Sequence, residues 1–108
     1  MKELHWIKMN LNCFDDITMS TLYQKRNGDS LCVFWLMLLT LAGSINDDGH
    51  VYTQIDKKVS IKALAKQCEL SNKFVREALQ EFASLKLIRW NGTDTLQIVD
   101  WSKYTVTR

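Results

Sequence analysis

Two helices joined by a short turn are indicated by residues 60–85, whose sequence is SIKALAKQCELSNKFVREALQEFASL. Ser60 and Ser71 each precede an amphipathic run, and serine is a preferred N-cap residue because its hydroxyl accepts a hydrogen bond from a free backbone N–H. In the first run, the apolar side chains that share one helix face are Ile61, Leu64, Ala65 and Cys68. The tight junction at residues 69–72 completes the pattern of a helix-turn-helix.

The second helix of this pair, expected over residues 71–85, has two clearly different faces. Its apolar arc holds Phe74, Val75, Ala78, Leu79, Phe82 and Leu85. Its polar arc holds Lys73, Arg76, Glu77 and Gln80. The two arcs separate cleanly when successive residues are placed about 100° apart. A polar arc with two positive charges in its first two turns is typical of a helix that reads DNA.

A β-hairpin is predicted directly after the helix pair. Residues 87–90 and 95–99 are strand-like, and the Asn91-Gly92 pair between them favours a turn. The β-branched and aromatic run 51–55 predicts another short strand before the first helix of the pair. The predicted fold class is therefore α+β and mainly helical, a winged helix-turn-helix in which the C-terminal hairpin is the wing.

Two further helices are predicted upstream. Asp15 or Asp16 can cap a first helix that runs to about Arg26, where Asn27-Gly28 interrupts it. Adjacent carboxylates at a helix start satisfy free N–H groups and the helix dipole more often than they catalyse acid–base chemistry.

The most hydrophobic segment, Leu31 to Ala42, starts after Asp29-Ser30 and is closed by a turn over residues 44–49. It is apolar on nearly all faces, so we expect it to be buried on nearly all sides. Its longest apolar run, Leu31 to Leu39, falls short of the roughly 20 residues that a membrane span needs. It is predicted to be the central core helix, with no membrane partner.

Composition fits one soluble domain over residues 1–108, because 46% hydrophobic and 24% charged residues supply a core for a chain of this length. The three cysteines are too few and too widely spaced for a disulfide framework or a zinc knuckle, which favours a reducing, cytoplasmic location. No nucleophile elbow or phosphate-binding glycine loop is present. We therefore expect no enzyme activity, no cofactor and no metal.

Charge is unevenly distributed along the chain. Residues 1–55 carry four basic and six acidic residues, whereas residues 56–108 carry ten basic and six acidic residues. A basic C-terminal half indicates an anionic partner such as nucleic acid, although a solvated lysine-rich helix produces the same count.

A more specific pattern joins the apolar helix to the turn that follows it. The sequence WLMLL at Trp35 to Leu39 leads through Ala42-Gly43 to Asn46-Asp47 and Gly49. This pattern belongs to a larger set of residues that carries a resemblance to a known family. The set is Trp6-Ile7-Lys8-Met9, Phe14-Asp15, Gly28-Asp29-Ser30, Trp35 to Gly43, Asn46 to Tyr52 and Trp101. In these residues, which extend over nearly the whole chain, the sequence resembles the N-terminal domain of phage replisome organisers, a family that looks related to the DnaD-type bacterial replication-initiation domain.

The resemblance implies a winged helix that binds duplex DNA of a replication origin. Replisome organisers are usually longer, with a C-terminal part implicated in contacts to helicase-loading proteins. The chain is accordingly expected to be either the N-terminal domain of a longer replication protein or a shorter relative. Many relatives lead into the helix pair with an acidic, proline-containing segment, whereas this chain has Lys57-Lys58-Val59-Ser60.

Candidate DNA contacts fall into two groups. Those on or beside the second helix are Ser71, Asn72, Lys73, Arg76 and Gln80. Those expected to contact the DNA backbone are Lys57, Lys58, Lys62, Lys66, Arg89, Asn91, Gly92 and Thr93. The alternative to a DNA-binding surface is an ordinary solvated face. Glu69, Glu77 and Glu81 lie near these basic residues in the sequence and repel phosphates.

The sequence leaves two other functions open, since winged helices also serve as protein-interaction modules and in transcriptional regulators. An oligomerisation module, and with it a homo-oligomer, is suggested by four aromatic residues near element ends: Trp6, Trp90, Trp101 and Tyr104. The simpler explanation is that these residues close one core beneath the wing.

Overall fold

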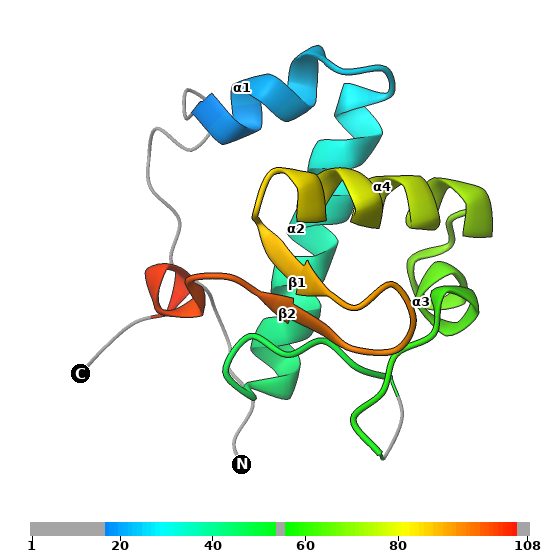
Figure 1. The fold of residues 1–108 in the computed structure, drawn as a ribbon, viewed down its shortest axis with the longest axis vertical. Helices are drawn as coiled ribbons and strands as arrows, with labels where there is room; N and C mark the ends of the chain where they lie inside the picture. The colour runs from blue at the N-terminus through cyan, green and yellow to red at the C-terminus, as the bar shows by residue number, and fades with distance from the viewer. Residues whose placement is uncertain (1–16, 54–55, 106–108) are drawn as a thin grey trace.

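The computed structural model describes residues 17–53 and 56–105 of the chain (Figure 1). The elements in these ranges are α1 (Ile17–Gln24), α2 (Gly28–Ile45), α3 (Ile61–Cys68), α4 (Asn72–Ser84), β1 (Ile88–Trp90), β2 (Leu96–Ile98) and the 3-10 helix η1 (Trp101–Tyr104). This mainly helical α+β order, with a hairpin after the helix pair, is consistent with a winged helix and confirms the predicted fold class.

The long helix α2 is the centre of the core. Figure 1 shows α4 crossing it, with the hairpin following directly after α4. The side chains of Phe34 and Phe82 are fully buried, and their rings stack with centroids 5.9 Å apart. Trp35 meets the same Phe82 ring edge-on at 5.4 Å. Aromatic pairs at these separations add attraction beyond the area they bury, so this cluster ties α4 to α2.

The expectation that this helix is buried on nearly all sides was wrong. The helix α2 is long and apolar enough to cross a membrane, yet half of its 18 residues are buried inside the protein. Val33 is 51% exposed, and Thr40 and Ser44 also face solvent. The buried half packs on α4, which is the arrangement of a core helix in a two-layer fold.

Both ends of α2 differ from the prediction. The helix begins at Gly28, one residue before the predicted Asp29-Ser30 start, because Asn27 takes a left-handed backbone conformation and its carbonyl accepts from the Leu31 N–H. It ends at Ile45, so the first two residues of the predicted turn are helical. Asn46, also left-handed, stops it there.

The first helix, predicted to run to about Arg26, ends at Gln24, and its predicted caps Asp15 and Asp16 lie outside the described residues. The cause is a close helix–helix approach. A Cβ at Gly28 would lie 2.1 Å from the Tyr23 carbonyl oxygen, so a side chain does not fit there. The Asn27-Gly28 pair therefore serves as a tight corner between α1 and α2.

The predicted strand over residues 51–55 was also wrong in the described part, and Gln54 and Ile55 lie outside it. Only an isolated bridge forms, between His50 and Gln97 of β2. Val51 donates to the Leu96 carbonyl at 3.0 Å, and the chain then folds back so that Thr53 donates to the Lys58 carbonyl at 3.4 Å. This early reversal leaves no length for a strand.

The helix pair and the hairpin follow the prediction closely. The Ser60 hydroxyl accepts from the Ala63 N–H at 3.0 Å, and the Ser71 hydroxyl accepts from the Phe74 N–H at 3.1 Å. The strands β1 and β2 are antiparallel, with the residue pairs Ile88–Ile98, Arg89–Gln97 and Trp90–Leu96 in register. The predicted boundaries hold to within one or two residues at the ends of these elements.

Aromatic residues close the core below the hairpin. Trp101 is 7% exposed, and Trp90 and Tyr104 pack against the core. The Tyr104 ring lies 6.3 Å from the Trp35 ring, which links η1 to α2. These three residues follow the simpler explanation given above, whereas Trp6 lies outside the described residues.

Cys32 and Cys68 are free thiols buried in the core. Burial raises the pKa of both, and the nearby Asp29 carboxylate raises that of Cys32 further. A raised pKa leaves less of the reactive thiolate at neutral pH. Cys13 lies outside the described residues.

Replacing Phe82 with alanine is expected to lower the free energy of unfolding by about 3–5 kcal/mol, because it removes a fully buried ring that contacts both Phe34 and Trp35. Urea unfolding followed by circular dichroism measures the change. Tyr23→Ala is the control, since its side chain is 65% exposed and its loss should cost less than about 0.5 kcal/mol. Equal losses in the two variants would contradict this account of the core.

Candidate nucleic-acid interface

The solvent face of α4 carries the side chains that the sequence singled out for DNA. Ser71, Asn72, Lys73, Arg76 and Gln80 are all exposed. On the opposite side, Val75, Ala78 and Phe82 are buried against the core. The amphipathic division predicted from the sequence is therefore present, and it leaves the polar arc of α4 open to a partner.

Local hydrogen bonds set the direction of α4 relative to α3. Glu69 takes a left-handed conformation at the end of α3, and its N–H donates to the carbonyls of Ala65 and Lys66. The Leu70 N–H donates to the Ala65 carbonyl at 2.9 Å, and the Ser71 cap then starts α4. These bonds leave little freedom in the turn, so the polar face of α4 is held in a defined orientation.

The four lysines predicted to contact the DNA backbone differ in their surroundings. Lys62 and Lys66 are exposed on α3 and stand outside the ion pairs of the described residues. Lys57 lies 3.4 Å from an Asp47 carboxylate oxygen, and Lys58 lies 3.8 Å from an Asp94 oxygen. The charges of Lys57 and Lys58 are thus partly balanced within the protein.

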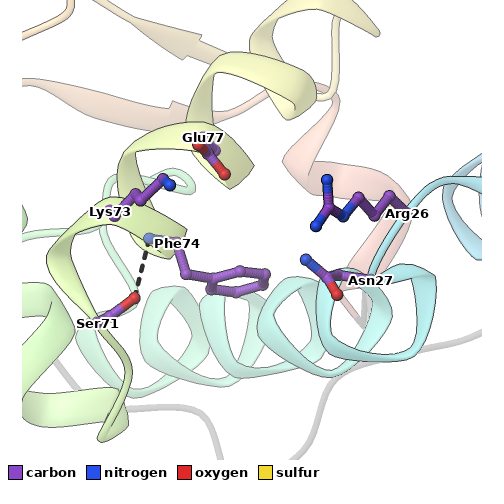
Figure 2. A pocket seen from close by; sticks show the side chains of 6 residues that line it. All are labelled: Arg26, Asn27, Ser71, Lys73, Phe74 and Glu77. Carbon is purple, nitrogen blue, oxygen red and sulfur yellow. Dashed lines mark hydrogen bonds between the residues drawn. The ribbon is translucent and has the colours of Figure 1, made fainter.

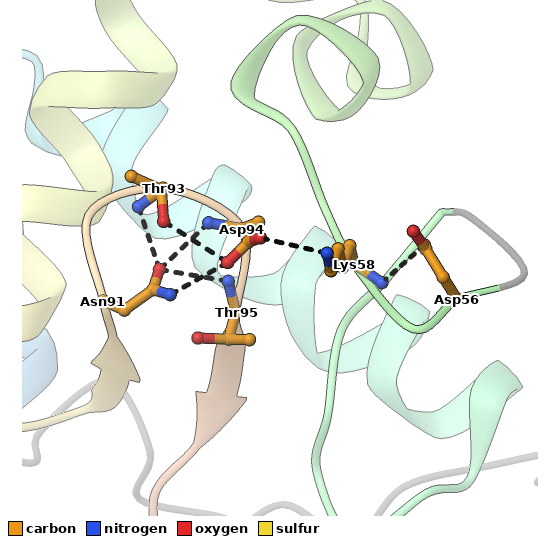
Figure 3. A network of polar contacts seen from close by, with 6 residues as sticks. All are labelled: Asp56, Lys58, Asn91, Thr93, Asp94 and Thr95. Carbon is orange, nitrogen blue, oxygen red and sulfur yellow. Dashed lines mark hydrogen bonds and ion pairs between the residues drawn. The ribbon is translucent and has the colours of Figure 1, made fainter.

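The wing tip is organised around Asn91 (Figure 3). Its side-chain oxygen accepts hydrogen bonds from the backbone N–H groups of Thr93, Asp94 and Thr95, at 2.9, 2.9 and 3.1 Å. Its amide nitrogen donates to Asp94 Oδ1 at 2.9 Å. Asn91, predicted as a DNA contact, therefore uses its side chain to hold the turn.

The other predicted wing residues are better placed for an external partner. Gly92 has a φ of 86°, which favours glycine, and a Cβ added there would meet nothing within 4 Å. Arg89 is exposed on β1, and its guanidinium donates to the Gln97 side chain at 3.4 Å. Gln97 in turn donates to the Asp48 carbonyl at 2.9 Å, so the base of the wing is tied to the end of the α2 turn.

Asp94 places a negative charge at the wing tip. The hydrogen bond from Asn91 lowers the pKa of this carboxyl, with smaller contributions from Thr93 and from the positive charge of Lys58. The Asp94 carbonyl also accepts from the Val59 N–H at 2.8 Å. Lys58 and Asp94 therefore join the wing tip to the segment that leads into α3 (Figure 3).

The junction between α1 and α2 was missed in the sequence as part of this surface. Lys25 Nζ lies 2.8 Å from a Glu81 oxygen, which brings the end of α1 against α4. Arg26 and Asn27 line an open cleft together with Lys73 and Phe74 (Figure 2). The only available signal was the basic Lys25-Arg26 pair, and nothing in the sequence places it beside a helix about fifty residues away.

Nothing in the described ranges groups three or more His, Cys, Asp or Glu side chains into a possible metal site. His50 is half-buried in the bridge to Gln97, and His5 lies outside the described residues.

Replacing Asn91 with alanine is expected to destabilise the protein by about 1 kcal/mol, because three backbone N–H groups lose a common acceptor at an exposed turn. Urea unfolding measures the loss, and amide hydrogen exchange locates it at residues 93–95. Thr93→Ala, which removes only a 3.3 Å bond to Asp94, is the control and should change stability less. A stable Asn91→Ala protein with unchanged exchange would rule out this role.

The carboxyl of Asp94 should titrate below the ordinary pKa of about 3.8, because its charged form is favoured by Asn91, Thr93 and Lys58 in the folded state. A folded pKa below the unfolded value gives a contribution to stability that is present above the unfolded pKa and is lost as pH falls through the folded pKa. The stability difference between the wild type and Asp94→Asn should therefore shrink between pH 7 and pH 3. Carbon-detected NMR titration of the Asp94 carboxyl checks the direction, and a midpoint above 3.8 would contradict it.

Comparison with known families identifies a match that covers nearly all of the chain. Residues 6–107 match the family described as the N-terminal phage replisome organiser. No curated protein and no solved structure matches the chain. The family acts in phage DNA replication, which takes place inside the infected cell, and it is not known to be catalytic. The match includes both helices of the pair, the hairpin and the apolar helix α2, and the chain therefore belongs to the N-terminal phage replisome organiser family.

Proposed function

We propose that this domain binds duplex DNA of a phage replication origin, with α4 in the major groove and the wing and α3 on the flanking backbone. The proposal rests on the division of α4 into a buried apolar face and an exposed polar face. One face is buried on α2, and the other presents Lys73, Arg76 and Gln80 to solvent in the second position of a helix-turn-helix. That second helix is the one that enters the groove in DNA-binding proteins of this architecture.

Arg76 is the residue proposed to read a base. It lies on the exposed face of α4, one turn from the Ser71 cap, and among the described residues it is in no ion pair. Its planar guanidinium matches the O6 and N7 acceptors of guanine. Asn72 and Gln80 flank it on the same face and supply further hydrogen-bonding groups.

The proposed backbone contacts surround this helix. Lys62 and Lys66 project from α3, which crosses the phosphates in this motif and does not enter the groove. On the wing, Arg89 and the open Gly92 tip are proposed to reach the sugar-phosphate or the minor groove. Asn91 supports this contact by holding the turn.

Acidic residues near this surface oppose DNA binding, and ion pairs reduce that opposition at two places. Lys25 pairs with Glu81 at 2.8 Å, and Lys58 pairs with Asp94. Glu69 and Glu77 stand outside the ion pairs of the described residues. Binding is proposed to depend strongly on salt, because the lysine and arginine side chains of this surface release counterions when they contact phosphates.

The wider proposal is a single domain over residues 1–108 that serves as the DNA-binding part of a cytoplasmic replication-initiation protein. Contacts to helicase-loading proteins belong, in this proposal, to a C-terminal region of a longer protein. A homo-oligomer on DNA is compatible with it, although Trp101 is buried in the core and Trp90 and Tyr104 are partly buried against it.

Arg76→Ala should cost about 1–3 kcal/mol on a preferred duplex and relax the preference at one base pair, because a base contact is lost. Lys66→Ala should weaken binding to all sequences alike and make the slope of log affinity against log salt shallower by about one, because a phosphate contact is lost. A preferred duplex is first selected from random DNA with the wild-type protein. Fluorescence anisotropy then compares both variants on this duplex and a scrambled one at two salt concentrations.

Three outcomes decide the proposal. Sequence-selective loss in Arg76→Ala with uniform loss in Lys66→Ala supports it. Equal losses of Arg76→Ala on both duplexes would show that α4 supplies charge without base reading. A wild-type protein that binds no duplex at low salt would remove DNA binding altogether and favour the protein-interaction function, which light scattering tests through the mass in solution.

A further inference from the structure

An open cleft of about 360 Å³ lies between the first turns of α4 and the corner that joins α1 to α2 (Figure 2). Its lining residues are Arg26, Asn27, Ser71, Lys73, Phe74 and Glu77. Phe74 is the apolar part of this lining, and its ring lies 6.1 Å from Phe34 of the core. The two walls of the cleft therefore belong to elements that pack on the same buried cluster, so the cleft is part of the rigid fold.

Polar groups from both walls point into the cleft. Figure 2 shows the Arg26 guanidinium and the Asn27 amide entering from one side and Lys73 entering from the other. Among the described residues, neither Arg26 nor Lys73 takes part in an ion pair. Asn27 is the N-cap residue of α2, yet its side chain makes no cap hydrogen bond. Two positive charges and an amide donor are thus directed at one space.

An ion pair next to the cleft adds to the excess of positive over negative charge there. Lys25 neutralises Glu81, which is the acidic residue of α4 next to the α1 end. This ion pair joins the corner to α4 and balances one of the two carboxylates of α4. Glu77 is the remaining acid in the cleft, so the lining carries two cations and one anion.

We propose that this cleft binds one phosphate of the DNA backbone, so that the α1–α2 corner adds a contact beyond the helix pair and the wing. The inference rests on the proposed function. Arg26 and Asn27 donate to the phosphate oxygens from one wall, and Lys73 faces the same group from α4. Lys73 lies one turn before the base-reading Arg76, so this phosphate belongs to the same duplex that α4 reads.

Glu77 weakens this site by repulsion of the phosphate, which makes it a sensitive probe. Removing its charge should raise DNA affinity if the cleft holds a phosphate, and the gain should depend on Arg26 and Lys73 being present. Lys73 and Glu77 lie four residues apart on α4 and attract each other even without DNA. The specific sign of a phosphate in the cleft is therefore coupling between Arg26 on one wall and Lys73 on the other in DNA binding.

The experiment compares Arg26→Gln, Lys73→Gln, the double variant and Glu77→Gln on the preferred duplex across a salt series. Lys103→Gln is the matched control, because it removes one exposed positive charge on η1, which lies away from the α1–α2 corner in Figure 1. Circular dichroism and urea unfolding of each variant verify that the fold is retained.

Arg26→Gln should lower affinity about three- to tenfold, equally on preferred and scrambled duplexes, and make the salt slope shallower by about one. The double variant should lose less than the product of the two single losses, because both cations serve one phosphate. Glu77→Gln should raise affinity severalfold in the wild type and less in the double variant. Lys103→Gln should leave the salt slope unchanged.

An Arg26→Gln protein that binds like Lys103→Gln overturns the inference, as does full independence of Arg26, Lys73 and Glu77. Failure of the proposed function has a different signature, since the wild type itself would then bind no duplex. A wild type that binds DNA and loses affinity in Arg76→Ala, but not in Arg26→Gln, retains α4 as the DNA-binding helix and removes only the cleft.

Discussion

The packing of Phe82 from α4 against Phe34 and Trp35 of α2 supports the rest of this structure. The two contacts are 5.9 and 5.4 Å between ring centroids, and the Phe34 and Phe82 side chains are inaccessible to solvent. Because side chains three and four apart share one helix face, burying Phe82 also directs Val75 and Ala78 inward. The opposite face of α4 must then lie in solvent, and that face holds Arg76.

The same cluster extends to the first turn of α4 and to η1. Phe74 joins it from the first turn of α4, and Tyr104 joins it through Trp35 from η1. The 3-10 helix η1 and the start of α4 therefore both pack on one central helix. A surface that recognises a partner needs such support, because side chains on a mobile helix lose binding free energy to the ordering of their positions. The side chains of Ser60 and Ser71 cap the starts of α3 and α4, which further limits the freedom of the helix pair.

Ion pairs within the protein, as well as the number of basic residues, decide which positive charges are available to a partner. The basic half of the chain contributes Lys57 and Lys58, yet both lie near carboxylates at 3.4 and 3.8 Å. Exposed ion pairs of this kind contribute little to stability, and their larger effect here is on which cations remain available to an anionic partner. Several described cations outside such pairs lie on α3, α4, the wing and the α1–α2 corner, the surface proposed for DNA, whereas Lys103 lies on η1.

The sequence by itself determined the helix pair, its serine caps, the hairpin and the polar arc of α4, because each depends on local periodicity or on a turn residue and its neighbours. It did not determine that residues 51–53 form no strand or that α2 is only half buried, because both depend on how far other elements extend beside them. The use of the Asn91 side chain is also local, since its partners lie two to four residues along the wing turn. Only the tertiary structure decided that Arg26 lies in one cleft with Lys73. These two residues lie on elements far apart in the chain, with no periodic signal between them, so packing of the helices brings them together.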